Sequence, residues 1–192
     1  GIQTFDQLME APREKVSRVL GSEPRADALL MAVASSLGHR GEKFHNLHER
    51  LAQSLGIGDL IGACSRDLGT DYKASIKSLL EFEKSWTVCA VDTKKRQNVP
   101  DLLVTLEGSS ILIECKTTTK KPPLIKKEDA FAVLQKSVDF DGSMHCLTIG
   151  KPSFDEHSKK KVQGTRNITL VEHEVFIEGM LRVAAREVTA TE

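Results

Sequence analysis

Two short apolar runs separated by a tight turn constrain the fold of this chain more than any other feature of its sequence. The runs are DLLVTL (101–106) and SILIEC (110–115), and Glu107-Gly108-Ser109 lies between them. Aliphatic and β-branched runs of this length, bounded by a glycine-containing turn, are typical of β-hairpins. We therefore predict two antiparallel strands that bring Asp101, at the start of the first, close to Glu114, at the end of the second.

Charged side chains gather at one end of this hairpin. Because side chains alternate between the faces of a strand, Glu114 and Lys116 point to the same side and Cys115 to the other. Two carboxylates held this close are unfavourable unless a cation lies between them. Lys116 can neutralise them as a structural ion pair, or a hard divalent cation such as Mg²⁺ can bind there. The strand pattern leaves both alternatives open.

The rest of the chain predicts helices on either side of further strands. The first 85 residues are helical in character, with Ser22 and Thr70 as helix caps, and an α/β pattern follows them. The expected helices are 23–37, 41–56, 70–85, 126–138 and 174–187, and the expected further strands are 86–91, 144–150 and 168–172. This order predicts an α/β fold with a mixed central sheet flanked by helices. A change in composition near Thr70 predicts a helical appendage over 1–69 and an α/β core over 70–192.

The charged residues of the hairpin resemble a known motif. Pro100-Asp101, then twelve residues, then Glu114-Cys115-Lys116 resembles the PD-(D/E)xK nuclease superfamily. The resemblance implies a restriction-endonuclease-like core in which Asp101 and Glu114 bind Mg²⁺, with Mn²⁺ as a substitute. It implies a further metal ligand in the main-chain carbonyl of Cys115, a catalytic role for Lys116 and a supporting role for Gln135.

Two further points bear on this resemblance. The strand at 168–172, followed by the helix at 174–187, is similar to the cleavage domains of type IIS restriction endonucleases. Many members of the superfamily carry an additional acid on the helix before the motif strands. Asp71, Glu81 and Glu83 compete for that role here, so the sequence leaves open whether one or two metal ions bind.

The function implied by the resemblance is a hydrolase: a Mg²⁺-dependent endonuclease on double-stranded DNA, in a restriction or phage-defence system. The alternatives are a catalytically silent DNA-binding or protein-interaction module of the same fold, and a nuclease that acts on RNA or on DNA ends. The expected partner is DNA. Two further partners are left open: a separate specificity domain or subunit, and a second copy of the chain in a homodimer.

Basic residues flank the motif strands although the chain has no net charge. Between Ala90 and Arg166 there are 14 Lys and Arg against 10 Asp and Glu, a local excess of +4. The residues predicted to contact the DNA backbone are Lys94, Lys95, Arg96, Lys120 and Lys121, with Lys126 and Lys127 beside them. The alternative is that these charges are only solvated loop residues.

Other motifs give weaker indications. The segment 51–63 has the outline of a helix-turn-helix, with Ser65 and Arg66 as its only candidate base-reading residues. The pair His45 and His48 does not match a zinc motif, and the four cysteines include no CxxC pair. The sequence shows no signal peptide and no 18-residue apolar span, which predicts a cytoplasmic protein without a membrane partner.

Overall fold

Two structural units divide the chain. The computed structural model describes residues 4–38, 42–92, 98–140 and 144–185. One unit comprises Gly1–Ile61 together with Glu178–Glu192, and the other comprises Gly62–Ile177. This division differs from the predicted 1–69 and 70–192, since the end of the last helix groups with the N-terminal helices.

The first unit is helical. Its elements are α1 (Phe5–Glu10), α2 (Arg13–Leu20), α3 (Glu23–Ser36), α4 (Glu42–Ser54), the start of α5 (Gly58–Arg66) and the end of α10 (His173–Ala184). The predicted cap of α3 is present, because the Ser22 side chain accepts a hydrogen bond from the backbone N–H of Arg25. The Arg13 guanidinium binds both carboxylate oxygens of the fully buried Asp27 at 2.6 Å and so ties α2 to α3.

The second unit is an α/β domain. Beside the end of α5 and the start of α10, its helices are α6 (Gly69–Leu80), α7 (Lys127–Ala130), α8 (Ala132–Lys136) and α9 (Glu156–Val162). Its strands are β1 (Thr87–Ala90), β2 (Leu102–Leu106), β3 (Ser109–Thr117), β4 (Leu124–Ile125), β5 (His145–Lys151), β6 (Ser153–Phe154) and β7 (Ile168–Glu172).

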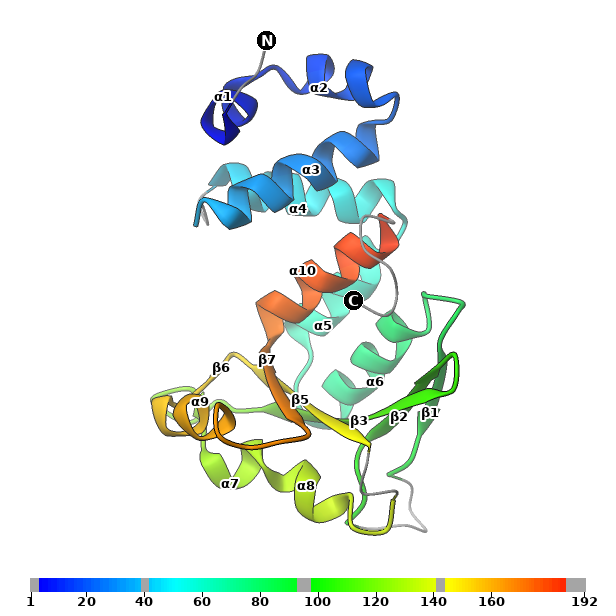
Figure 1. Cartoon of the computed structure of the whole chain (residues 1–192), viewed down its shortest axis with the longest axis vertical. Coiled ribbons are helices and arrows are strands. Elements are labelled where there is room, and N and C mark those ends of the chain that lie inside the picture. The colour runs from blue at the N-terminus through cyan, green and yellow to red at the C-terminus, as the bar shows by residue number, and fades with distance from the viewer. Residues whose placement is uncertain (1–3, 39–41, 93–97, 141–143, 186–192) are drawn as a thin grey trace. The chain divides into compact units, whose positions relative to one another are not determined.

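Five of the strands form a mixed sheet in the order β1-β2-β3-β5-β7. The first three are antiparallel neighbours, whereas β3, β5 and β7 run parallel. Figure 1 shows α6 on one side of this sheet and α7 and α8 on the other. The predicted fold class, an α/β domain with helices flanking a mixed sheet, is therefore confirmed.

Each face of the sheet buries an apolar layer. The apolar face of α6 is buried, with Tyr72, Ile76 and Leu79 all at 0% exposure. On the other face, Leu112 of β3 and Val133 of α8 belong to one buried cluster, which also contains Ala130, Cys146 and Phe154. The β2–β3 hairpin therefore lies between two layers of helices, and these layers fix the surroundings of its charged end.

The hairpin turn is shorter than predicted. Leu106 pairs with Ser109, so only Glu107 and Gly108 form the loop. Both have positive φ, 48° and 83°, which is the geometry of the two-residue turns that match the twist of antiparallel strands. Ser109 is therefore the first residue of β3 and not part of the turn.

Two predicted helix boundaries are wrong. The helix expected over 126–138 is broken at Phe131, which has φ −100° and ψ 4°, and it ends at Lys136. Val138, the last residue of the expected range, is 79% exposed. Thr70 does not cap α6: the helix already includes Gly69, whose N–H donates to the Thr117 hydroxyl at the end of β3.

A small second sheet was missed by the sequence analysis. β4 and β6 pair in parallel over only two residues each, a length too short for a periodic signal. The helix α9 follows, and the Asp155 side chain caps it by accepting from the Ser158 N–H. None of the described helices is both long enough and apolar enough to cross a membrane.

Candidate active site

Two buried carboxylates lie at one end of the β2–β3 hairpin. Leu102 pairs with Ile113, so continuing the antiparallel register by one residue places Asp101 opposite Glu114. Asp101 is 2% exposed and Glu114 is 1% exposed. Buried ionised carboxylates require cations or hydrogen-bond donors close by, so the groups around them decide what the site can do.

Asp101 is fixed by one backbone group and one cation. Its Oδ2 accepts a hydrogen bond of 2.8 Å from the backbone N–H of Cys115, the residue next to Glu114. Its Oδ1 lies 2.5 Å from the ammonium of Lys73 on α6. Lys73 also contacts Asp92, at 3.1 Å. The predicted approach of Asp101 to the end of β3 is therefore present.

Glu114 receives two lysines on the same oxygen. Lys116 Nζ lies 2.9 Å from Glu114 Oε1, and Lys136 Nζ, on α8, donates to the same atom at 2.5 Å. The other oxygen, Oε2, is buried and has no hydrogen-bond partner among the described residues. A buried carboxylate oxygen without a partner is a position that a further donor or a cation would stabilise.

The donor set fits a hard cation that has few protein ligands. Among the described residues, no three side chains of His, Cys, Asp or Glu gather closely enough to hold a metal ion. What the hairpin offers instead is one oxygen atom without a partner on Glu114, the Asp101 carboxylate, and main-chain carbonyls. Mg²⁺ is commonly held by one or two carboxylates, with water and substrate phosphate completing its shell, so these residues fit it.

Burial and ion pairing shift the pKa values of two neighbours of Asp101. The thiol of Cys115 is buried, which raises its pKa well above the ordinary value, and the charge of Asp101 adds to this shift. The thiol therefore stays protonated, and only the main-chain carbonyl of Cys115 can serve as the predicted ligand. Burial alone would lower the pKa of Lys73, but its pairing with Asp101 and with Asp92 outweighs burial and raises that pKa.

The additional acid sought on the preceding helix is not found beside Asp101. Glu81 pairs with Lys77, the Glu83 side chain accepts from Ser85, and Asp71 is exposed. The residue of α6 that reaches Asp101 is a cation, Lys73. Lys73 was not predicted, because the resemblance implies a carboxylate on this helix.

The helix after the motif strands also contributes a residue that was not predicted. Gln135, expected to support the site, is exposed, whereas the next residue, Lys136, binds Glu114. Successive residues of a helix point about 100° apart, so the way α8 lies on the sheet decides which of them reaches the site.

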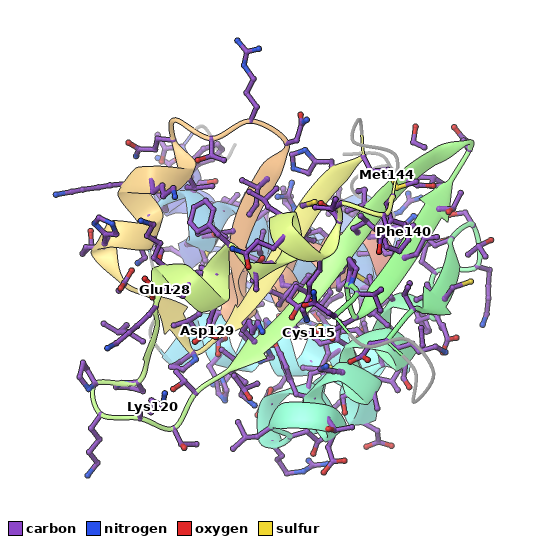
Figure 2. The ribbon with its side chains drawn as sticks, turned by 90° about the horizontal axis from the view of Figure 1, so that it is seen from below. Cys115, Lys120, Glu128, Asp129, Phe140 and Met144 are labelled. Atoms are coloured by element: carbon purple, nitrogen blue, oxygen red, sulfur yellow. The ribbon has the colours of Figure 1, made fainter. Side chains whose placement is uncertain are left out.

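The predicted DNA-backbone residues lie partly outside the described chain. Lys94, Lys95 and Arg96 are in the segment 93–97, which the structure does not describe. Lys120 and Lys121 are exposed, and Figure 2 shows Lys120 on the loop that leaves the strand carrying Cys115. This loop begins directly after Lys116 and Thr117, at the end of β3 where the carboxylates lie.

The segment considered as a helix-turn-helix does contain two helices, α4 and α5, with Gly56 at φ 72° between them. The end of α5 is bound to the sheet, however. The Lys151 ammonium, at the end of β5, donates hydrogen bonds to the carbonyl oxygens of Cys64, Ser65 and Asp67. Ser65 and Arg66, the candidate base readers, are exposed beside this attachment.

Comparison with known proteins adds no family to this description: no protein-family model, no curated protein and no solved structure matches the chain. The geometry of the hairpin end is therefore the basis for a proposal about function.

Proposed function

We propose that this protein is a Mg²⁺-dependent nuclease with a restriction-endonuclease-like core, acting as an endonuclease on double-stranded DNA. The observation that carries the proposal is the end of the β2–β3 hairpin. Two carboxylates are almost fully buried there, one oxygen of Glu114 has no hydrogen-bond partner among the described residues, and Lys116 lies beside it. These are the residues of the Pro-Asp and Glu-x-Lys motif, on adjacent strands.

Asp101 and Glu114 are the residues that would hold the cation. When bound, Mg²⁺ supplies positive charge to a phosphodiester and lowers the pKa of a water molecule. The Cys115 N–H orients the Asp101 carboxylate, and the two helical layers keep both carboxylates away from bulk water. Because these ligands would already be held in place, little conformational entropy would be lost when the metal ion binds.

Lys116 is the residue best placed to contact substrate. Its side chain retains 24% exposure, whereas that of Glu114 retains 1%, so the lysine side chain is partly accessible while its partner is not. A positive charge held there would stabilise the negative charge that develops on a phosphoryl group during hydrolysis. Lys120 and Lys121, a few residues further on, would contact neighbouring phosphates of the backbone.

One observation favours a second candidate, a silent DNA-binding or protein-interaction module. Lys73, Lys116 and Lys136 already neutralise both carboxylates without a metal ion. In a silent module these contacts would be purely structural ion pairs, and the Glu114 oxygen would be satisfied by water.

An incubation with three substrates separates the two candidates. Supercoiled plasmid, linear duplex and single-stranded RNA are each incubated with the protein in Mg²⁺, in Mn²⁺ and in EDTA. The nuclease proposal expects cleavage of circular and linear DNA in Mg²⁺, and none in EDTA or with the Asp101→Asn variant. Cleavage of RNA alone would reassign the substrate, and an absence of cleavage throughout would favour the silent module.

A further inference from the structure

The cations around Asp101 and Glu114 bear on how many metal ions this site can take. Two carboxylates are contacted by three ammonium groups, from Lys73, Lys116 and Lys136. These five groups together carry a net charge of +1 before any metal ion binds. Asp92, a partly exposed residue that contacts Lys73, brings the sum to zero when it is included.

Each lysine comes from a different element, so the arrangement belongs to the fold and not to one flexible segment. Lys73 projects from α6, Lys116 from β3 and Lys136 from α8. Their side chains are 31%, 24% and 18% exposed, against about 1% for each carboxylate side chain. Each carboxylate is therefore buried against lysine side chains that remain partly exposed.

We infer that the Asp101–Glu114 site takes one divalent cation, and that Lys73 supplies beside Asp101 the charge that a second cation would otherwise supply. This inference rests on the proposed function, since it concerns the same metal site. Three observations support it. The helix before the motif strands presents a cation to Asp101, and no third carboxylate among the described residues joins the two. Within the described chain, each carboxylate has one buried oxygen without a hydrogen-bond partner, and of these two Asp101 Oδ1 is in ion-pair contact with Lys73, which leaves Glu114 Oε2.

The charge sum favours one ion over two. One Mg²⁺ takes the five groups from +1 to +3, a charge that the scissile phosphate and its two neighbours would balance. A second Mg²⁺ would take the sum to +5, with Lys73 already occupying one Asp101 oxygen. Repulsion between like charges in a partly buried site is stronger than in water, so the second ion is disfavoured.

A consequence follows for the affinity of the first ion. Lys73 and an incoming cation both interact with Asp101, and they repel each other. Replacing Lys73 by glutamine removes the positive charge and frees Asp101 Oδ1, so the variant should bind a divalent cation roughly tenfold or more tightly than the parent. A purely structural ion pair predicts the opposite, because the site would be disordered in the variant.

The test is a titration of the protein with Mn²⁺ alone. Binding is measured by calorimetry and by the electron paramagnetic resonance signal of free Mn²⁺. The parent, Lys73→Gln and Lys77→Gln are compared. Lys77 is a matched control, because it lies one turn further along α6, has the same 31% exposed side chain and pairs with Glu81 instead of Asp101. We expect one ion per chain in the parent, tighter binding in Lys73→Gln and nearly unchanged binding in Lys77→Gln.

Three outcomes would overturn the inference: two ions per chain in the parent, unchanged or weaker binding in a folded Lys73→Gln protein, and equal gains in both variants. Circular dichroism checks that each variant is folded, and the stoichiometry of the parent decides the first point even if Lys73→Gln does not fold. Absence of Mn²⁺ binding in every protein would overturn the metal-dependent function as well. Two bound ions in a parent that cleaves DNA would leave the function standing and remove only this inference.

Discussion

The carboxylate of Asp101 accepts a hydrogen bond of 2.8 Å from the backbone N–H of Cys115, fourteen residues further along the chain. This contact connects Asp101, the residue before β2, to Cys115, which lies between the charged residues Glu114 and Lys116 on β3. Asp101 therefore has two roles in the structure: it satisfies a buried backbone donor at the end of the hairpin, and it presents its other oxygen to Lys73.

The two roles of Asp101 can be separated by substitution. Asp101→Ala leaves the Cys115 N–H buried without an acceptor, so we expect the free energy of unfolding to fall by about 1–3 kcal/mol. Asp101→Asn keeps an acceptor oxygen and should be less destabilised, yet it should lose divalent-cation binding and cleavage. Urea unfolding and Mn²⁺ titration measure the two effects. Asp92→Asn is the control, since Asp92 also contacts Lys73 but is more exposed. Cleavage by Asp101→Asn at the parental rate would place the activity elsewhere.

Lys116 and Lys136 contact the same oxygen of Glu114, which makes them a matched pair. If Lys116 stabilises developing charge, Lys116→Ala should reduce cleavage by on the order of a hundredfold or more while the protein still binds Mn²⁺. Lys136→Ala should have a smaller effect on cleavage, because in the proposed mechanism Lys136 contacts only Glu114 and not the substrate. Single-turnover rates at saturating Mg²⁺ measure this difference. Equal losses in the two variants would mean that both lysines act only through the position of Glu114.

The loop after β3 should set affinity for nucleic acid without setting sequence preference. Replacing Lys120 and Lys121 by glutamine should weaken binding to all duplexes alike and should reduce the slope of log K against log salt by about one unit per lost phosphate contact. Fluorescence anisotropy in EDTA, where no cleavage is expected, measures both quantities. Lys15→Gln with Arg18→Gln removes the same charge from exposed positions on α2 and serves as the control. An unchanged slope would show that these lysines touch no phosphate.

Stability should fall at alkaline pH because a buried thiol resists ionisation. Burial raises the pKa of Cys64 to about 12, with the charge of Asp67 adding to the shift. Above the pKa of an unfolded cysteine, about 8.5, the unfolded chain loses the proton while the folded chain keeps it. Each such thiol therefore lowers the free energy of unfolding by about 1.4 kcal/mol per pH unit, up to the folded pKa.

Unfolding by urea at several pH values between 8 and 10 tests this dependence. Cys64→Ala should be less stable at neutral pH, because the residue is fully buried, but its stability should decline less steeply as the pH rises. Cys89→Ala is the control, since Cys89 is exposed. Parallel pH curves for the parent and Cys64→Ala would show that this thiol ionises equally in both states.

The hairpin and its charged end could be predicted from the sequence because their determinants are local. The two apolar runs and the glycine-containing turn predicted that Asp101 and Glu114 meet, without any information from distant residues. The exact register was not predicted, because the turn consists of Glu107 and Gly108 alone and is one residue shorter than expected. The flanking helices were also predictable, since buried residues such as Tyr72 and Ile76 recur at helical spacing.

The partners of the carboxylates could not be predicted in the same way. Lys73 and Lys136 reach the site only because of the way α6 and α8 dock on the two faces of the sheet, and that docking depends on contacts between distant segments. The break at Phe131 could not be predicted either, because the segment has an uninterrupted helical pattern in the sequence. Gly150 gives no signal either, yet a Cβ atom there would lie 2.3 Å from the Phe154 ring.

The contacts of Lys151 have a consequence for the dynamics of the α/β unit. Its ammonium has three N–H groups, and all three are directed at carbonyl oxygens at the end of α5. No donor remains for a phosphate, although Lys151 ends the strand next to the one that carries Lys116. The last turn of α5 can unfold only if the hydrogen bonds from Lys151 break. We therefore expect the backbone amides of the two segments to be protected from hydrogen exchange together, as one cooperative unit.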